Sequence, residues 1–472
     1  MSDRIGILSY ASYLPHWRLR REAISGVLGS GGARGSRAVA GYDQDTTTMA
    51  VEAGRVALRG YDGSPAALVF SSSFPAYADK TNATTVHAAL NLPSQVRASD
   101  ACGSVRSAVG ALLAGLHQPG GTLVTVADTR TGPAGSPDEA GGGDAAAAFV
   151  VGPGDPIAEV LAVGSATSEF LDRWRAPGEP WSQSWEERFG EDVYVGLAEQ
   201  ATERALELAG LRADQVDRWA MTGLSPRAVK RVSRSLELAD GVLADDLSSQ
   251  IGVAAAAHAG LLLADLLDQA QPGEVLALTV LADGADTFVL RAGEQITDHR
   301  QPEPVREQAA RGDDSLSYAD FLTWKGQLQR PAPRRPAPDR AVAPATYRHQ
   351  DWKYGFVAST CEKCGTRHLP PQRVCLSCHS VDAMRAEPMA DARARIATYT
   401  IDHLAFSLAP PTVGVVLDLD GGGRFSCELT DCDPEQVRVG QPVQLTFRRI
   451  SDASGIHNYF WKARPAAEGE TA

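Results

Sequence analysis

The sequence predicts a layered α/β domain, followed by a zinc ribbon and a small β-barrel. From residue 1 to about 300, short apolar runs alternate with alanine-rich stretches of helical periodicity. Residues 327–350 are rich in proline, alanine and arginine, which is typical of a semi-rigid linker. Two Cys-x-x-Cys pairs and several short alternating segments follow the linker. They indicate a metal-binding ribbon and a barrel.

The apolar runs before residue 300 predict strands, and the alanine-rich periods predict helices. The predicted strands are 5–13, 67–72, 121–127, 146–151, 218–222 and 274–281. The predicted helices are 46–60, 84–92, 102–116, 195–208 and 254–267. After the linker, the predicted strands are 395–401, 412–419, 424–429 and 443–448. The pattern before residue 300 runs through twice, which suggests a duplication without a residue-level repeat.

Composition and charge exclude several classes of protein. The 472 residues are enough for two or three domains. The formal net charge of -13 argues against nonspecific binding to nucleic acid, which requires a basic face. No apolar run reaches about 18 residues, so no membrane span is expected, and the first residues lack a signal-peptide pattern. We therefore expect a cytoplasmic protein.

Four cysteines form the strongest local signal in the sequence. Cys361 and Cys364 make one Cys-x-x-Cys pair, and Cys375 and Cys378 make another, ten residues later. Two such pairs supply the four thiolates that a tetrahedral Zn²⁺ site requires. A filled four-thiolate site has no open position, so the zinc is expected to be structural. The alternatives are a ribbon that has lost its metal, or two disulfides.

Cys102 is a solitary cysteine at the start of the predicted helix 102–116. Ser99 or Asp100 is expected to cap this helix. The first turn of a helix favours a thiolate and lowers the pKa of a cysteine, as nucleophilic acyl transfer requires. The alternative is an inert buried cysteine, which is the more common fate of a lone one.

Five stretches of the first 300 residues carry a resemblance to a known family. They are GILSYASYLP (6–15), AGYDQD (40–45), DACG (100–103), GDAAAAF (143–149) and FLDRWRAPG (170–178). These residues resemble the thiolase superfamily, in the branch of HMG-CoA synthase and type III ketoacyl-ACP synthase. Two later stretches, DGGGRF (420–425) and GIHNYFWKAR (455–464), resemble acyl-CoA-associated OB-fold proteins with an N-terminal zinc ribbon.

The resemblance implies a thiolase fold, in which two βαβαβαββ halves form five α-β-α-β-α layers. It also implies a rubredoxin-like zinc ribbon and an OB-fold barrel at the C-terminal end. The implied domains are 1–165 and 166–326 for the two halves, 327–350 for the linker, 351–385 for the ribbon and 386–472 for the barrel. Such proteins are usually dimers, so a homodimer or a heteromer with a thiolase-fold homologue is expected.

The resemblance implies that Cys102 is the nucleophile, acting on thioesters of CoA or of an acyl carrier protein. HMG-CoA synthases also use a glutamate, a histidine and an asparagine. Alignment by eye places Ser72, Leu224 and Val253 at these three positions. None of these side chains supplies a base, which carbon–carbon bond formation requires.

Other groups are candidates for the missing roles. The backbone amides of Cys102 and Gly284 are candidates for an oxyanion hole. His258, Asp283 and Asp286 are candidates for the missing base, although a histidine in a long alanine-rich helix is more often structural.

Three functions remain open at this point. The first is a diverged acyltransferase or condensing enzyme that is acylated on Cys102. The second is a retro-aldol lyase that acts on acyl-CoA and retains activity without the thiol. The third is a non-catalytic subunit that binds or channels acyl-CoA and supports a competent homologue.

Overall fold

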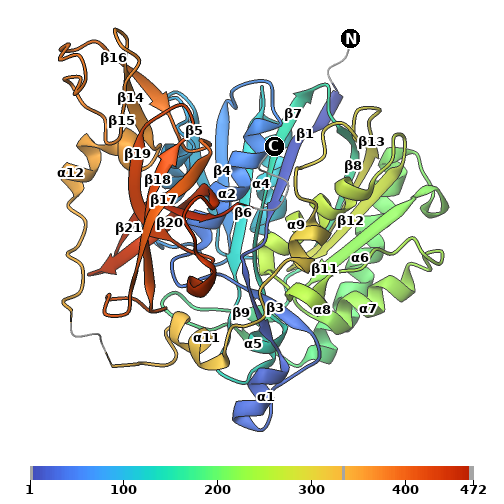
Figure 1. Ribbon diagram of the computed structural model, residues 1–472. Helices are drawn as coiled ribbons and strands as arrows, with labels where there is room; N and C mark the ends of the chain where they lie inside the picture. The colour runs from blue at the N-terminus through green and yellow to red at the C-terminus, as the bar shows by residue number, and fades with distance from the viewer. Residues whose placement is uncertain (1–3, 332–334, 467–472) are drawn as a thin grey trace. The chain divides into compact units, whose positions relative to one another are not determined.

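The chain forms two compact units, which Figure 1 traces from the N-terminus to the C-terminus. The computed structural model describes residues 4–331 and 335–466. Unit 1 comprises Met1–Ala40, Asp45–Thr84 and Ser94–Phe321. Unit 2 comprises Gly41–Gln44, Thr85–Pro93 and Leu322–Ala472. Two short N-terminal segments therefore belong to the same unit as the C-terminal part of the chain.

Unit 1 is built on a nine-stranded mixed sheet, in the order β11-β12-β13-β8-β1-β7-β6-β4-β5. Its strands are β1 (Arg4–Tyr13), β4 (Ala67–Ser72), β5 (Arg97–Cys102), β6 (Thr122–Thr129), β7 (Asp144–Gly154), β8 (Ala158–Thr167), β11 (Arg218–Gly223), β12 (Val275–Leu281) and β13 (Gly284–Ala292). Two small separate sheets consist of β2 (Trp17–Arg20) with β3 (Ser36–Val39), and of β9 (Arg173–Trp174) with β10 (Gln183–Ser184).

The helices before residue 325 vary from one turn to six. They are α1 (Glu22–Leu28), α2 (Thr46–Arg59), α3 (Ala83–Ala89), α4 (Ser107–Leu116), α5 (Pro137–Gly141), α6 (Glu187–Ala209), the 3₁₀ turn η1 (Ala213–Gln215), α7 (Pro226–Ser235), α8 (Ser248–Ile251), α9 (Ala255–Gln269), α10 (Val305–Ala310) and α11 (Tyr318–Trp324).

The sheet repeats one strand order in its two halves. The first half contains five strands, which in chain order are β1, β4, β5, β6 and β7. From the edge of the sheet to its centre they lie in the order third, second, fourth, fifth, first, and the fifth strand, β7, is antiparallel to both of its neighbours. In the second half, β8, β11, β12 and β13 take the first, second, fourth and fifth places of the same order. The third place holds only an isolated parallel bridge between Trp219 and Leu243. The duplicated thiolase fold is therefore confirmed, with one strand reduced to a bridge.

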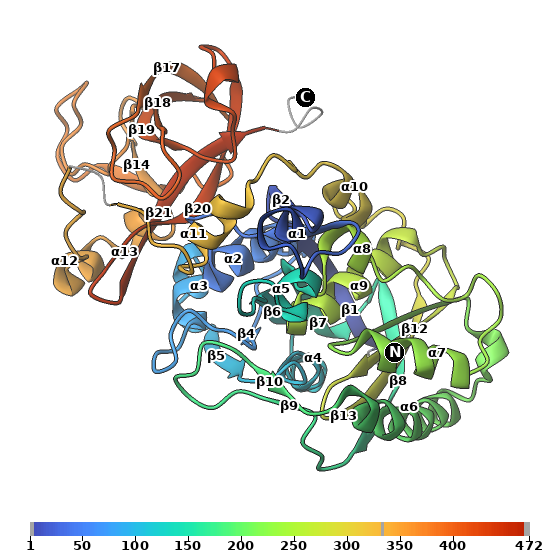
Figure 2. The ribbon, with the colours of Figure 1, turned by 90° about the horizontal axis from the view of Figure 1, so that it is seen from below.

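Helices cover both faces of each half of the sheet. Helix α2 packs on β1, β6 and β7, whereas α6 packs on β8 and β13 (Figure 2). Helix α4 packs on β4 to β7, and α9 contacts strands of both halves as well as α4. Helices α4 and α9 therefore form the middle layer of the five.

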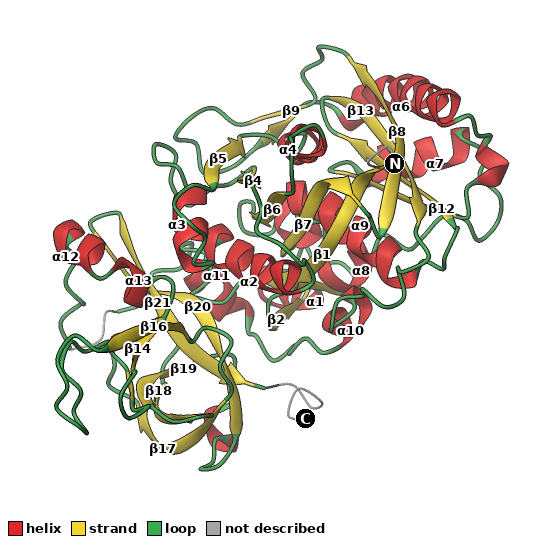
Figure 3. Ribbon diagram, turned by 90° about the horizontal axis from the view of Figure 1, so that it is seen from above, coloured by secondary structure: helices red, strands yellow, loops and turns green. Residues whose placement is uncertain are grey.

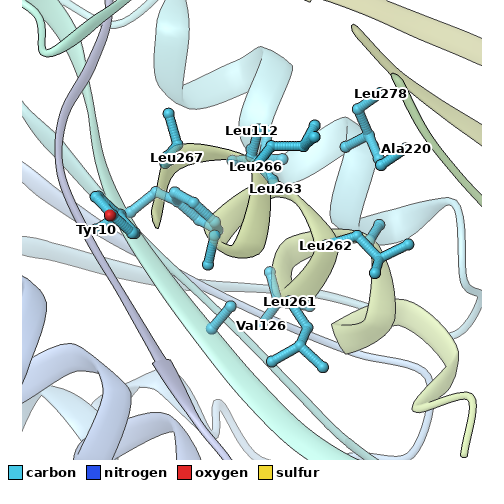
Figure 4. Close-up of a cluster of buried hydrophobic side chains, with 14 of the residues drawn as sticks. Tyr10, Leu112, Val126, Ala220, Leu261, Leu262, Leu263, Leu266, Leu267 and Leu278 are labelled. Atoms are coloured by element: carbon cyan, nitrogen blue, oxygen red, sulfur yellow. The ribbon is translucent and has the colours of Figure 1, made fainter. Parts of the chain in front are cut away.

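The middle layer is buried, and nearly every residue of α9 is inaccessible to solvent, including His258, Asp265 and Asp268. The leucines from Leu261 to Leu267 of this helix pack with Tyr10, Leu112, Val126 and Leu278 (Figure 4). These partners come from β1, α4, β6 and β12, so both halves of the sheet share one core. Helix α9 begins at Ala255, and the N–H of Ala256 in its first turn donates a hydrogen bond to the Asp128 carboxylate (2.7 Å).

Unit 2 contains a zinc-ribbon-like sheet and a closed five-stranded barrel (Figure 3). The ribbon consists of β14 (Val357–Cys361), β15 (Arg367–His368) and β16 (Met384–Pro388), and two short helices precede it, α12 (Ala343–Arg348) and α13 (Gln350–Lys353). The barrel consists of β17 (Ala394–Asp402), β18 (Thr412–Leu419), β19 (Arg424–Leu429), β20 (Pro442–Ala453) and β21 (Ile456–Pro465), with the 3₁₀ turn η2 (Pro434–Gln436). Its order, β17-β18-β19-β21-β20, is that of an OB-fold.

Some predicted boundaries differ from the structure. Residue 165 lies inside β8, so the second half of the sheet begins before the predicted limit, because β8 pairs with β13 throughout its length. Residue 385 lies inside β16, and the predicted linker contains the helix α12. Residues 332–334 of that linker and 467–472 of the predicted barrel domain lie outside the described residues. Among the residues described, no helix has the length and apolar character needed to cross a membrane.

Candidate functional site: a strand-end cleft and a four-cysteine cluster

The four ribbon cysteines converge in unit 2. Every pair of their sulfur atoms lies within 4.8 Å. The Cys361–Cys378 pair is separated by 3.6 Å, and the Cys364–Cys375 pair by 3.5 Å. A tetrahedral zinc with Zn–S bonds of about 2.3 Å requires sulfur atoms about 3.8 Å apart, so these thiols fit the metal. All four cysteines are free thiols, which contradicts the alternative of two disulfides.

In unit 1, the residues of the predicted acyl site gather where the strands end. Ser72 and Cys102 are the last residues of β4 and β5, and they are partners in the parallel register of these strands. A cleft of about 130 Å³ is lined by the residues that directly follow them in the chain. Residues that follow β4, β5, β11 and β12 line this cleft: Ser73, Phe74, Gly103, Leu224, Ala282 and Asp283. The strand ends thus bring together residues that are far apart in the sequence.

Cys102 is half-buried, and its thiol is not activated by a helix. Burial, together with the charges of Asp100 and Asp128, raises the pKa of Cys102 to about 12, although a hydrogen bond with the backbone of Ser72 lowers it. The expected lowering of this pKa is therefore wrong. A neutral thiol at pH 7 is a weak nucleophile until a base or a positive charge approaches it.

The predicted helix 102–116 begins five residues late, which explains this difference. Cys102 ends a strand, Gly103 has a φ of 120°, and α4 starts only at Ser107. A residue with positive φ cannot continue a right-handed helix. The expected capping role of Asp100 is also wrong, because its carboxylate accepts hydrogen bonds from the backbone N–H groups of Asn82 (2.7 Å) and Ala83 (2.8 Å), at the start of α3.

Asp128, on β6, is a buried carboxylate that the sequence analysis missed. Its Oδ1 accepts hydrogen bonds from the Ser72 hydroxyl (2.9 Å) and from the backbone N–H groups of Ser73 (2.9 Å) and Phe74 (3.1 Å). Its Oδ2 accepts from the Ser73 hydroxyl (3.0 Å) and from the Ala256 N–H (2.7 Å). Burial raises the pKa of Asp128 to about 6, although these donors lower it. Asp128 therefore ties the turn after β4 to the start of α9.

The C-terminal part of the chain matches two known domain families. Residues 353–382 match the family described as "ChsH2, rubredoxin-like zinc ribbon domain". Residues 386–448 match the family described as "ChsH2, C-terminal OB-fold domain". These matches agree with the ribbon and the barrel of unit 2.

The remainder of the chain matches hydroxymethylglutaryl-CoA synthases. The enzyme of Archaeoglobus fulgidus is 31% identical over 345 residues, which cover 68% of this chain and 97% of the relative. The chain belongs to the hydroxymethylglutaryl-CoA synthase family. This membership agrees with the motifs around Cys102.

Solved structures agree with this family in their fold. MvaS in complex with 3-hydroxy-3-methylglutaryl coenzyme A has a TM-score of 0.58 at 20% identity, over 72% of this chain and 96% of that chain. The 3-oxoacyl-(acyl carrier protein) synthase III of Pseudomonas aeruginosa has a TM-score of 0.54 at 21% identity, over 62% of this chain and 98% of that chain. At these identities, the likeness shows the thiolase fold of unit 1 and no more.

The three positions aligned with the family's catalytic partners carry no acid or base. Ser72 is fully buried, and its hydroxyl donates to Asp128. Leu224 lines the cleft directly after β11. Val253 is buried, and its N–H donates to the carbonyl of Gly141 (2.9 Å), just before α9. The loss of the catalytic partners stays a prediction, because it depends on the alignment.

Two of the three residues proposed to replace the missing base form hydrogen bonds with other parts of the chain. His258 is buried in α9, and its Nε2 lies 3.0 Å from the carbonyl oxygen of Asp246. Burial lowers the pKa of His258 to about 4, so its ring is neutral at pH 7. Asp286 is buried and accepts two hydrogen bonds from Arg106 (2.9 and 3.2 Å). Of the three substitutes, Asp283 is the one that lines the cleft.

Gly284, a predicted oxyanion-hole residue, is the first residue of β13 and has a φ of 138°. A Cβ atom at this position would lie 2.5 Å from the carbonyl oxygen of Ala166 and 2.6 Å from the Arg106 guanidinium. Only glycine fits here, because both the space and the backbone conformation exclude a side chain. The oxyanion role of Gly284 and Cys102 stays a prediction.

Reintroducing the family's histidine at Leu224 is expected to activate Cys102. A protonated imidazole in the cleft would stabilise the thiolate and lower the pKa of the thiol. At a fixed pH near 6, where an imidazole of ordinary pKa (about 6.5) is mostly protonated, each unit of this decrease gives about tenfold more thiolate and faster alkylation by iodoacetamide. Peptide mapping of Cys102 in Leu224→His measures the rate, and Leu208→His, at an exposed position of α6, is the control. Equal rates in both variants would show that Leu224 does not face the thiol.

Proposed function

We propose that this protein is an acyltransferase or condensing enzyme that accepts the acyl group of a thioester on Cys102. In this reaction, the sulfur of Cys102 attacks the thioester carbonyl, and the carrier thiol leaves with the proton of the cysteine. The observation that supports it best is the cleft beside the ends of β4 and β5, lined by Ser73 and Gly103, in a chain of the HMG-CoA synthase family. Cys102 is half-buried rather than sealed in the core.

The carrier is proposed to be CoA or an acyl carrier protein, both of which are anionic. Helix α7 starts two residues after Leu224 and carries Arg227, Lys230, Arg231 and Arg234 without an acidic residue. Arg231 pairs with Asp192 (2.5 Å), whereas Lys230 and Arg234 have no acidic partner in the described parts of the chain. In a protein with a net charge of -13, this basic face beside the cleft favours an anionic carrier.

A dimer is part of this proposal. Strand β5 is the last strand of the nine-stranded sheet, so its outer edge has unpaired backbone groups among the described residues. An uncovered edge strand is a ready surface for pairing with a second chain. A homodimer through β5, or a heteromer with a thiolase-fold homologue, would cover this edge, and Cys102 is the last residue of the strand.

Intact-protein mass spectrometry tests the proposal directly. Incubation with acetyl-CoA, propionyl-CoA and acetoacetyl-CoA is expected to add one acyl mass to the chain, and Cys102→Ala is expected to abolish the adduct. Cys427→Ala is the matched control, because burial raises the pKa of Cys427 to about 12 as well, but this residue lies on β19 of the barrel. An adduct that survives in Cys102→Ala, or is absent with every thioester, contradicts the proposal.

A non-catalytic acyl-CoA-binding subunit is the second candidate. The raised pKa of Cys102 favours it, because an unactivated thiol reacts slowly. Leu224 and Val253 offer no titratable group to activate the thiol. This function predicts that acyl-CoA raises the melting temperature by mass action without forming an adduct. The same samples therefore separate the two candidates.

A further inference from the structure

The cleft has one carboxylate whose position suits proton transfer. Two acidic residues line it, Asp172 and Asp283. Asp172 is engaged, because its Oδ2 accepts a hydrogen bond from the Tyr194 hydroxyl (3.3 Å). Asp283 is exposed to the cleft, and its carboxylate accepts no hydrogen bond from any residue that the structure describes. An unengaged carboxylate in a cleft is available to a bound molecule.

The backbone of Asp283 is fixed in an uncommon conformation. Asp283 is in the turn between β12 and β13 with a φ of 49°, which is uncommon for residues other than glycine. The turn is closed by a hydrogen bond from the Ala282 N–H to the Gly284 carbonyl (3.0 Å). Strain of this kind persists where the surrounding structure holds it.

Arg106 holds this turn and connects it to the segment that follows Cys102. Its Nη1 donates to the carbonyl oxygen of Asp283 (2.9 Å), while its other guanidinium nitrogens bind the Asp286 carboxylate. Arg106 follows Cys102 by four residues and caps the N-terminus of α4. The residues between them, Gly103 to Val105, line the same cleft as Asp283. Arg106 thus links the segment after Cys102 to the turn that carries Asp283.

The surroundings of Asp283 raise the pKa of its carboxyl above the ordinary value. Burial raises its pKa, and the charges of Asp172 and Glu169 raise it further, whereas Arg106 acts in the opposite direction. Tyr194 also lies beside the turn, and the pKa of its hydroxyl is raised, so it is neutral at pH 7. Three arginines, Arg130, Arg173 and Arg175, line the same cleft. A carboxylate with a raised pKa removes protons more effectively than an ordinary one.

We propose that Asp283 is the acid/base residue of the cleft and takes a proton from the α-carbon of the bound acyl thioester, an inference that rests on the function proposed above. The Cα–H bond breaks, and its proton moves to a carboxylate oxygen of Asp283. The electron pair of that bond forms the C=C bond of an enolate, and the carbonyl π pair moves to the oxygen. Return of a proton from Asp283 restores the thioester, so no oxidant or further reactant is needed.

Exchange of α-protons with solvent measures this step without a second substrate. The wild-type protein in D₂O is expected to introduce deuterium into the acyl group of acetyl-CoA or propionyl-CoA, which mass spectrometry detects. Asp283→Asn is expected to slow exchange by at least about 100-fold, because general-base catalysis contributes 10²–10⁴. Asparagine also tolerates positive φ, so this variant keeps the turn. Asp283→Glu is expected to restore part of the rate.

The control is Asp298→Asn, which removes an exposed carboxylate away from the cleft and is expected to leave exchange unchanged. The wild-type rate should rise with pH through the titration of Asp283, and Asp283→Asn should lose this dependence. Exchange that survives in Asp283→Asn, or is absent from the wild type with both thioesters, overturns the inference. Loss of the Cys102 adduct in the wild type would instead contradict the proposed function, so the two failures are distinguishable.

Discussion

Replacing Cys375 by serine is expected to remove zinc from the ribbon and to unfold residues 353–388. The ribbon has only three short strands, so the metal supplies most of its stability. Structural zinc sites contribute on the order of 10–16 kcal/mol in zinc-finger peptides, which exceeds what a sheet of this size gains by packing. Metal analysis by mass spectrometry is expected to find one zinc per wild-type chain and none per chain in Cys375→Ser.

Limited proteolysis reports the folding of the ribbon in the same samples. New cleavage between β14 and β16 is expected in Cys375→Ser, and the same cleavage is expected when a chelator removes zinc from the wild type. His379→Asn is the control, because this histidine is surplus to the four thiols and asparagine tolerates its φ of 58°. A wild-type chain that holds no zinc, or a Cys375→Ser chain that keeps it, would disprove the assignment.

The ribbon site could be predicted from the sequence because its chemistry is local. Each Cys-x-x-Cys pair fixes two ligands within one turn, and the pairs are only ten residues apart. The fold of unit 1 was also predictable, because strands and helices alternate along the chain. Its third strand in the second half was not, since only the bridge at Leu243 remains.

The cleft was less predictable because it depends on distant strands. The sequence indicated Cys102 as a candidate but placed it on a helix, since the helical spacing of Val105, Val109 and Leu112 does not reveal the turn at Gly103. Asp128 was missed, although an aspartate directly after the buried run 121–127 was a visible signal. Its partners at Ser72 and Ala256 lie 56 and 128 positions away.

A buried charge cluster in unit 2 escaped the sequence analysis for the same reason. Asp43 and Arg448 are 405 positions apart, and their charged atoms lie 3.3 Å from each other. Lys462 lies 3.0 Å from the other oxygen of Asp43. The side chains of all three residues are at most 2% exposed. Arg448 also pairs with Asp431 (2.5 Å), and Lys462 with the partly exposed Glu428 (2.5 Å).

Replacing Asp43 by alanine is expected to destabilise unit 2 by about 3–5 kcal/mol. The reason is that the buried cations Arg448 and Lys462 would lose the carboxylate with which both of them pair. Hydrogen exchange of the backbone amides in β20 and β21 measures this loss. At about 1.4 kcal/mol per factor of ten, exchange through unfolding of the barrel should be on the order of 100- to 4000-fold faster. Glu428→Ala is the matched control and should cost less than about 1 kcal/mol, because its carboxylate is 42% exposed.

The pH dependence of this cluster follows from the directions of its pKa shifts. Burial alone would raise the pKa of Asp43, but Lys462 and Arg448 outweigh it and hold the pKa below its usual value. Burial would lower the pKa of Lys462, but Asp43, Tyr42 and Glu428 hold it above its usual value. The stability from Asp43 is therefore lost as pH falls below the ordinary range of a carboxylate, and that from Lys462 is lost only in strong base. The loss of stability caused by Asp43→Ala should be full at pH 7 and smaller in acid. A loss of stability that is equal at pH 7 and pH 3 would exclude an electrostatic origin.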